Sequence, residues 1–435
     1  MLRRLRIRNP GRVPRWLRLA VIGLCGAVFV VVPLGWAGNP GKLHLRRVFE
    51  QKLSAPILSL DIAKGSDLIA VALATGKVQV LKFGGDKIVH EIPFPETETD
   101  ERQKEEDEVE PIRVRFSPDG GTLAITFLSR IYQYEPGTWQ EVRSLGVGGE
   151  DTMRPRPAPE LERRPTADDT HEQRPEMAMS RTYGAWKQQR IRGDGRTRIT
   201  DFAFTPDGTG ILAAYCRGSC YDSRARRNGA EPSGNDPLRL WDVRSGQLVW
   251  EHMQQREGAI ERVVVSPDGS RFAASSIQKP NRVVEVHDLR TGRLLFSSRP
   301  THYTDPAPPI HFTPDGKKLI TFCVSGCFER RNLDSWQQLA IYDASDGKMM
   351  GQFSDHDGAH WSDLSPDGRL LAATTWYGGT IKLWDVARGQ VIDWKLAKFG
   401  LWLRAFINIV RFDPDGRRLI VANDQKGVIA IYELQ

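Results

Sequence analysis

Four of the five cysteines stand in two closely spaced pairs, and such thiols can form disulfides, bind a metal or take part in redox chemistry. In each pair three residues, with a glycine and a serine among them, separate the cysteines. In an oxidising compartment such pairs are normally joined, and glycine lets a short loop bring the two Cα atoms within bonding distance. We therefore expect two local disulfides, each stabilising by about 2 kcal/mol on loop-entropy grounds. The expected pairs are Cys216–Cys220 and Cys323–Cys327.

Two other interpretations of the cysteines stay open. The thiols are free, or all four bind one metal ion, although zinc sites more often place two residues between paired cysteines. Elsewhere the chain has no His-Glu-x-x-His, no Gly-x-Ser-x-Gly and no phosphate-binding loop. Carboxylates are frequent, but no two of them are set apart as an acid–base pair. We therefore expect no catalytic residue, no cofactor and no metal site.

An unusually apolar stretch at 399–406 contains residue types that dominate protein interfaces. Tryptophan and arginine are enriched among the residues that carry most of the binding energy. A second interpretation, that the stretch packs over the ends of neighbouring strands, stays equally open. With two other aromatic pairs, the candidate partner contacts are Phe399, Trp402, Arg404, Phe406, Trp376, Tyr377, Tyr183 and Trp186.

The elements that would position these residues are strands joined by one recurring turn. Six turns have the form Ser/Thr/Asp-Pro-Asp-Gly, in which proline presets φ and glycine supplies a positive φ. A degenerate seventh copy lies at 63–67. Each turn follows an alternating strand and precedes a short apolar run, a pattern typical of β structure. The aspartates, which we interpret as turn formers, are Asp119, Asp207, Asp268, Asp315, Asp367 and Asp415.

Most copies end in a strand that closes with an aromatic residue and an acid. The clearest examples are Trp241-Asp242 and Trp384-Asp385, and His287-Asp288 is a variant. A period of roughly 40–50 residues with four strands is typical of a repeat array. Over about 43–435 the chain resembles the WD40-repeat family, although its first two copies lack the Trp-Asp dipeptide. The resemblance implies an all-β, seven-bladed β-propeller in which these repeat positions are structural.

In a propeller of this kind the first strand completes the last blade, and residues 43–50 are suited to that position. Closure removes an exposed sheet edge. If the strands of a blade are called a to d from the axis outward, every long insertion falls between b and c or between d and the next a. These connections leave from one face, which we interpret as the working surface. The insertions are 96–110, 146–198, 217–236, 324–335 and 395–407.

Composition sets one of these insertions apart. Residues 146–198 are rich in Arg, Pro and Glu and have little apolar periodicity, so we expect disorder there.

The amino terminus has the pattern of a membrane segment. Residues 1–18 carry seven arginines, 19–37 are apolar, and 38–42 form a short linker. A helix of that length spans about 28 Å, close to the thickness of a bilayer core. Because the basic residues are concentrated before the span, we expect a transmembrane helix with a cytoplasmic amino terminus and an extracytoplasmic propeller. A cleaved secretory signal ending at Gly35-Trp36-Ala37 is the alternative.

The formal net charge of +7 does not favour a nucleic-acid partner, because much of the basic excess lies before the apolar span. The Arg-, Pro- and Gly-rich composition is typical of a bacterial protein. We therefore expect a non-catalytic, membrane-anchored platform for protein partners, in the periplasm or at the cell surface. The alternative is a propeller enzyme or small-ligand sensor that uses the central channel, which polar side chains converging at the axis would favour.

Overall fold

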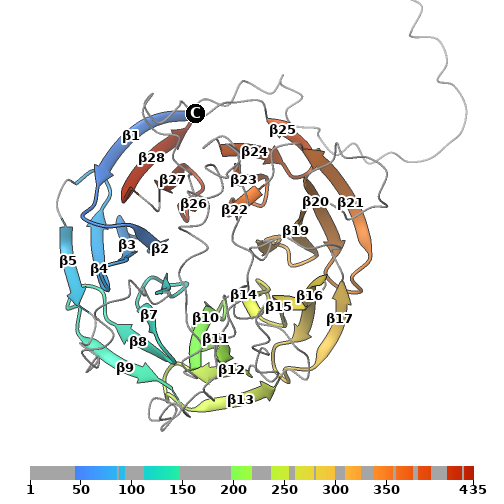
Figure 1. Ribbon diagram of the computed structural model, residues 1–435, viewed down its shortest axis with the longest axis horizontal. Helices are drawn as coiled ribbons and strands as arrows, with labels where there is room; N and C mark the ends of the chain where they lie inside the picture. Colours follow the sequence, from blue (N-terminus) through green and yellow to red (C-terminus); the bar gives the residue numbers. More distant parts are fainter. Residues whose placement is uncertain are drawn as a thin grey trace, which may run out of the picture. The chain divides into compact units, whose positions relative to one another are not determined.

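The computed structural model describes residues 45–435 apart from twelve internal segments, and every regular element in the described part is a β-strand. The strands form seven four-stranded antiparallel sheets arranged as blades in a ring (Figure 1). The expectation of an all-β, seven-bladed propeller is therefore confirmed. The internal segments outside the description are 86–87, 94–111, 147–196, 218–236, 254–259, 279–280, 299–308, 325–336, 356–358, 376–380, 393–408 and 424–425.

Each blade contains one strand of each kind, a to d, and d lies at the circumference (Figure 1). The a strands are β2 (Ile57–Ile62), β6 (Val114–Phe116), β10 (Thr197–Phe204), β14 (Ile260–Val265), β18 (Ile310–Phe312), β22 (Ala359–Leu364) and β26 (Ile409–Phe412). The b strands are β3 (Leu68–Leu73), β7 (Leu123–Phe127), β11 (Gly210–Arg217), β15 (Arg271–Gln278), β19 (Lys318–Val324), β23 (Leu370–Thr375) and β27 (Arg418–Asn423). The c strands are β4 (Lys77–Lys82), β8 (Arg130–Tyr134), β12 (Pro237–Asp242), β16 (Asn281–Asp288), β20 (Gln337–Asp343), β24 (Ile381–Asp385) and β28 (Val428–Leu434). The d strands are β5 (Ile88–Pro93), β9 (Glu141–Leu145), β13 (Leu248–Met253), β17 (Leu294–Ser298), β21 (Met349–Asp355), β25 (Gln390–Ile392) and β1 (Leu45–Lys52).

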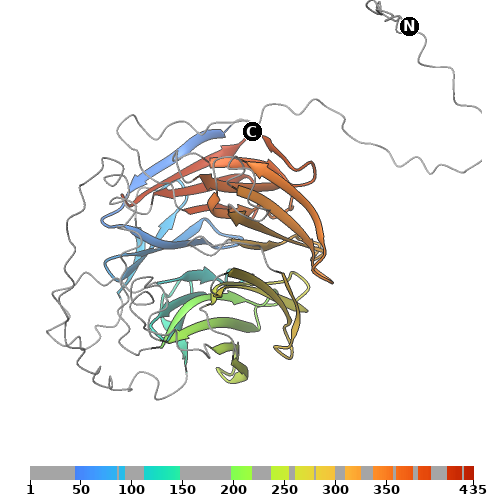
Figure 2. The same cartoon turned by 45° about the vertical axis from the view of Figure 1, so that its right-hand side comes forward.

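Burial decreases outward through each blade. Strand β3 is apolar along its whole length and almost entirely buried, because both faces of its sheet pack against neighbouring blades. Strand β9, at the circumference, is mostly exposed or half-buried and carries charged residues. The sheets are twisted, as the oblique view shows (Figure 2). Adjacent blades can therefore bury apolar surface in a ring without any helix in the described part.

The Pro-Asp-Gly turns are held by a repeated set of hydrogen bonds. Ser117 Oγ donates to Asp119 Oδ1 at 2.5 Å, and that oxygen also accepts from the Gly121 N–H at 3.0 Å. The Thr122 N–H donates to Ser117 Oγ, and Gly120 has a φ of 75° that glycine adopts without strain. The same bonds recur at Asp207, Asp268, Asp315 and Asp367. These carboxylates stabilise turns, and the hydroxyl of Ser266 lowers the pKa of Asp268 to about 2.

The residues at the end of strand c have two structural roles. Trp241 and Trp384 are buried in the core, and Trp241 Nε1 donates to the Tyr215 hydroxyl at 3.2 Å. The acid that follows holds the c–d turn: Asp242 Oδ1 accepts from the Ser245 N–H at 2.7 Å. Asp385 Oδ1 accepts from the Arg388 N–H in the same way, at 2.9 Å.

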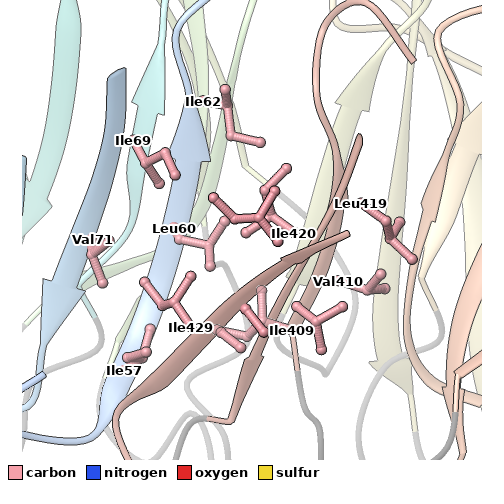
Figure 3. Packing of buried hydrophobic residues seen from close by; sticks show 14 of the residues in the cluster. Ile57, Leu60, Ile62, Ile69, Val71, Ile409, Val410, Leu419, Ile420 and Ile429 are labelled. Atoms are coloured by element: carbon pink, nitrogen blue, oxygen red, sulfur yellow. The ribbon is translucent and has the colours of Figure 1, made fainter. Parts of the chain in front are cut away.

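The ring closes through β1, which lies antiparallel to β28 in the seventh blade. It occupies the place that the sequence analysis gives to residues 43–50. Where the seventh blade meets the first, Ile420 packs against Leu60 and Ile62 (Figure 3). This apolar cluster joins the two ends of the repeat array.

Among the described residues no helix is long and apolar enough to cross a membrane. Residues 1–42 form a unit separate from 43–435 and lie wholly outside the description. The span predicted at 19–37 and its orientation therefore stay predictions.

Candidate functional site

The strand ends divide the connections between two faces of the propeller. The turn face carries the a–b and c–d turns, none of which exceeds six residues by the strand bounds. The loop face carries the b–c and d–a connections, because antiparallel strands bring the ends of b and d to the starts of c and a. Every predicted insertion belongs to the loop face. The predicted partner contacts within 183–186, 376–377 and 399–406 lie outside the described residues.

The cysteines are only partly described. Cys216 lies in β11, is buried and is disulfide-bonded. Its expected partner Cys220 lies outside the description, as does Cys327, and Cys323 lies in β19. The two pairings therefore stay predictions. Within the described part of the chain, no group of His, Cys, Asp and Glu is arranged to hold a metal ion.

A group of charged and titratable side chains, which we call the axial cluster, comes from the a strands and from Arg113, the residue directly before β6. Arg115 interacts electrostatically with Asp363, four blades away along the chain, which requires both to lie near the ring axis. Every blade contributes at least one member. The axial cluster is Asp61, Arg113, Arg115, Asp201, Arg262, His311, Asp363 and Arg411.

Strand geometry explains why these positions converge. Each member stands two or four residues before the first residue of the a–b turn, and positions two apart in a strand share a face. In β10 and β14 the register shifts just before Asp201 and Arg262. Such a bulge re-aims the side chain that follows it.

The three aspartates of the axial cluster join neighbouring blades through the backbone. Asp61 Oδ2 accepts from the Phe116 N–H at 2.7 Å. Asp201 Oδ2 accepts from Val263, and Asp363 Oδ2 accepts from Phe412 at 2.8 Å. In each case the donor is in the a strand of the next blade. These carboxylates therefore act first as connections between blades.

The four arginines are paired unequally. Arg115 Nη2 lies 3.0 Å from Asp201 Oδ1, and Arg411 Nη1 lies 3.1 Å from Asp363 Oδ1. Among the described residues, the hydrogen-bond acceptors of Arg113 are the backbone carbonyls of Leu58 and Thr200, each at 3.3 Å.

Arg262 reaches across the axis to a blade that is not its neighbour. Its guanidinium carbon lies 4.0 Å from the centre of the Trp361 ring. Within the described part of the chain, Arg262 has no carboxylate within ion-pair distance.

Burial and mutual repulsion set the protonation of the axial cluster. Burial lowers the pKa of Arg262 to about 10, and Arg113 is the strongest of the nearby cations that act in the same direction. Burial also raises the pKa of Asp61 and of Asp363, although the nearby arginines oppose it. For Asp201, burial is outweighed by three arginines, headed by Arg115, and its pKa is lowered.

Such a cluster is better suited to binding than to proton transfer. Each carboxylate is committed through one oxygen to a backbone N–H, and His311 Nε2 is hydrogen-bonded with Ser362 Oγ at 2.9 Å. The side chains of Arg115 and Arg411 are nevertheless 23% and 17% exposed, so solvent reaches the axis. Converging polar side chains of this kind are what the small-ligand alternative requires.

The axial cluster is not among the functional residues predicted from the sequence. A signal was present, since arginine and aspartate recur two and four residues before the turns. Inner-strand residues were interpreted only as alternating strand positions. Their chemistry depends on which blades meet at the axis, and that is not a local property of the chain.

Comparisons with known proteins agree with this architecture. Residues 347–385 match the family described as WD domain, G-beta repeat, and the match ends at Asp385. The fold is a seven-bladed β-propeller, and this match identifies one of its repeats as similar to a WD repeat.

Among particular proteins, the chain is similar to Eukaryotic translation initiation factor 3 subunit I from three organisms. The protein of Lodderomyces elongisporus is 34% identical over 101 residues, which cover 22% of this chain and 27% of the relative. That of Scheffersomyces stipitis is 35% identical over 103 residues, with the same coverage. That of Phaeosphaeria nodorum is 31% identical over 98 residues, covering 21% of this chain and 27% of the relative. The chain thus matches about a quarter of the length of these relatives.

Proposed function

We propose that the chain is a non-catalytic platform that binds protein partners on the loop face of its propeller. The asymmetry between the two faces carries this proposal. The turn face has only short, hydrogen-bonded turns, whereas every long insertion leaves from the loop face. Loops set on a rigid scaffold are where binding residues concentrate.

The amino-terminal segment bears on the compartment in which the propeller works. We propose that a helix at 19–37 anchors the chain, with the amino terminus in the cytoplasm and the propeller in the periplasm or at the cell surface. The basic residues before the span support this orientation, and the disulfide at Cys216 is in keeping with an oxidising compartment. Cleavage after residue 37 would give a secreted propeller instead.

The cysteines offer a direct check on the compartment. Peptide mapping without reduction, on protein taken from its native compartment, should find Cys216 linked to Cys220 and Cys323 linked to Cys327. Four free thiols in that sample would contradict the proposed compartment.

The relatives support a second candidate with other partners. They are named as a subunit of a translation initiation factor, so a chain that shares 31–35% identity with them over about 100 residues is a candidate component of such an assembly. That role requires a cytoplasmic propeller. The shared part is only about a fifth of this chain, and we therefore favour the anchored platform.

Cross-linking in intact cells, followed by capture of the tagged full chain, tests the platform. Replacing Trp402 and Arg404 by alanine should reduce recovery of the main partners about tenfold, the effect of losing roughly 1.4 kcal/mol at a binding hot spot. The matched control is Arg388→Gln in a turn of the turn face, which should recover the same partners as the wild type. Recovery no greater than from untagged cells would count against a platform.

A further inference from the structure

The axial cluster carries more positive than negative charge. Among the described residues at the axis, four guanidinium groups stand against three carboxylates. The axial cluster also contains the imidazole of His311. Burial and the neighbouring arginines lower its pKa to about 3, so this imidazole is neutral. Asp201 and Asp363 each give one oxygen to a backbone N–H and the other to Arg115 or Arg411, so neither has an oxygen left for Arg262.

Arg262 is the cation with the fewest compensating contacts. Its guanidinium lies over the face of Trp361, a buried residue, and Arg411 lies 5.8 Å from the centre of the same ring. An aromatic face attracts a cation, but it accepts no N–H hydrogen bond in the way that an oxygen does. In the described part of the chain, no oxygen accepts a hydrogen bond from this guanidinium.

Two more donors at the axis lack acceptors. The Nε atoms of Arg115 and Arg411 are buried, and within the described residues neither has a hydrogen-bond partner. Buried polar atoms in folded proteins are nearly always paired, so each exception needs an explanation. Here the exceptions lie on two arginines that flank the same axis as Arg262.

We propose that the axial cluster binds a small oxyanion, a phosphate or carboxylate group, between Arg262 and the solvent-exposed parts of the Arg115 and Arg411 side chains. Guanidinium groups recognise such oxyanions through paired N–H donors held in a rigid, planar arrangement. The anion would give the Arg262 guanidinium an oxygen acceptor and reduce the repulsion among the four arginines. The partial exposure of Arg115 and Arg411 gives it access from solvent.

The competing explanation is that the axial cluster only holds the blades together. In that case the propeller has no anion site, and Arg262 stabilises the fold by packing on Trp361. The two explanations differ in whether the wild-type chain binds an oxyanion and whether the charge of Arg262 controls that binding.

Calorimetric titration of the full-length chain with inorganic phosphate, pyrophosphate and citrate, at constant ionic strength in chloride, tests the proposal. We expect saturable binding of at least one probe at one site per chain, together with a concentration-dependent rise in Tm. A preference for the phosphates or for citrate identifies the class of oxyanion.

Variants then place the site. Arg262→Gln should weaken binding at least tenfold, Arg262→Lys should weaken it less, and Arg388→Gln in a c–d turn should bind like the wild type. No saturable binding of any probe by the wild-type chain would overturn the proposal without use of a variant. Wild-type affinity in a folded Arg262→Gln protein, or an equal loss in Arg388→Gln, would overturn it as well.

Discussion

At the scale of single residues, the axis shows how burial and neighbouring charge fix a protonation state. His311 is hydrogen-bonded with Ser362 and lies near Arg411 and Arg262. Burial, with help from these cations, lowers its pKa from 6.5 to about 3. The imidazole is therefore neutral in the folded propeller at every pH where the protein is normally handled.

Replacing His311 by glutamine should remove part of the pH dependence of stability. Between pH 6.5 and about 3 the unfolded chain binds a proton that the folded chain does not, so stability decreases as the pH falls through this range. Relative to His311→Gln, the wild type should lose up to about 1.4 kcal/mol per pH unit below pH 6.5. Urea unfolding at pH 7.5, 6.0 and 5.0 measures this difference. Parallel losses in the two proteins would show that the folded state does not lower the pKa of His311.

Sequence reasoning succeeded for residues whose role is complete within one turn. Asp119 needs only Ser117 before it and the backbone after it, so its role could be recognised from five consecutive positions. The ion pair between Arg115 and Asp201 joins residues 86 positions apart in different blades. No local pattern specifies that contact, and for this reason the axial cluster was found only in the folded ring.

At the scale of elements, the connection from β1 to β2 is held against the b–c turn of the seventh blade. The Leu53 N–H donates to the Gly427 carbonyl at 2.7 Å. A Cβ atom on Gly427 would lie 2.3 Å from the Ala55 carbonyl oxygen, and its φ of +66° is itself unfavourable for other residues. The backbone at position 427 therefore lies in direct contact with the backbone of the β1–β2 connection, and only glycine fits at that position.

Gly427→Ala should destabilise the propeller through this contact. The left-handed conformation alone costs about 1–2 kcal/mol, and displacing the Ala55 carbonyl adds to it. We expect the free energy of unfolding in urea to fall by at least about 2 kcal/mol. The matched control is Gly76→Ala, in the b–c turn of the first blade, where φ is +77° and no atom lies within 4 Å of the added Cβ. An equal loss in both variants would show that the contact with Ala55 has no energetic role.

The strands and turns were largely predictable, because alternation and Pro-Asp-Gly turns are local signals. The bulges were not. The register of β14 shifts between Ile260 and Arg262. The sequence of β14 contains no residue type that predicts an extra, unpaired position there. The shift lies directly before Arg262, and a bulge there re-aims the side chain that follows it.

At the scale of the whole propeller, closure by β1 should be required for stability. Leu45 and Phe49 of β1 pack against the apolar cluster that joins the first and last blades, and β1 pairs with β28 along its length. Removing residues 1–52 exposes the edge of β28 and this apolar surface. The loss of two partly buried apolar side chains alone should cost about 3 kcal/mol.

Removing only residues 1–42 is the control for this deletion, because it leaves the compact unit from residue 43 onward intact. Thermal unfolding followed by circular dichroism should show a cooperative transition for the control and a lower, broader transition or aggregation for the longer deletion. Identical transitions would mean that β1 contributes nothing to closure.

The central claim, a platform held outside the cytoplasm, is tested most directly by a dual topology reporter fused after Gln435. One half of the reporter is active only in the cytoplasm and the other only outside it. The anchored platform predicts activity of the extracytoplasmic half alone in cells that express the full chain. Activity of the cytoplasmic half alone would contradict the claim, and would favour instead an assembly of the kind named for the translation-factor relatives.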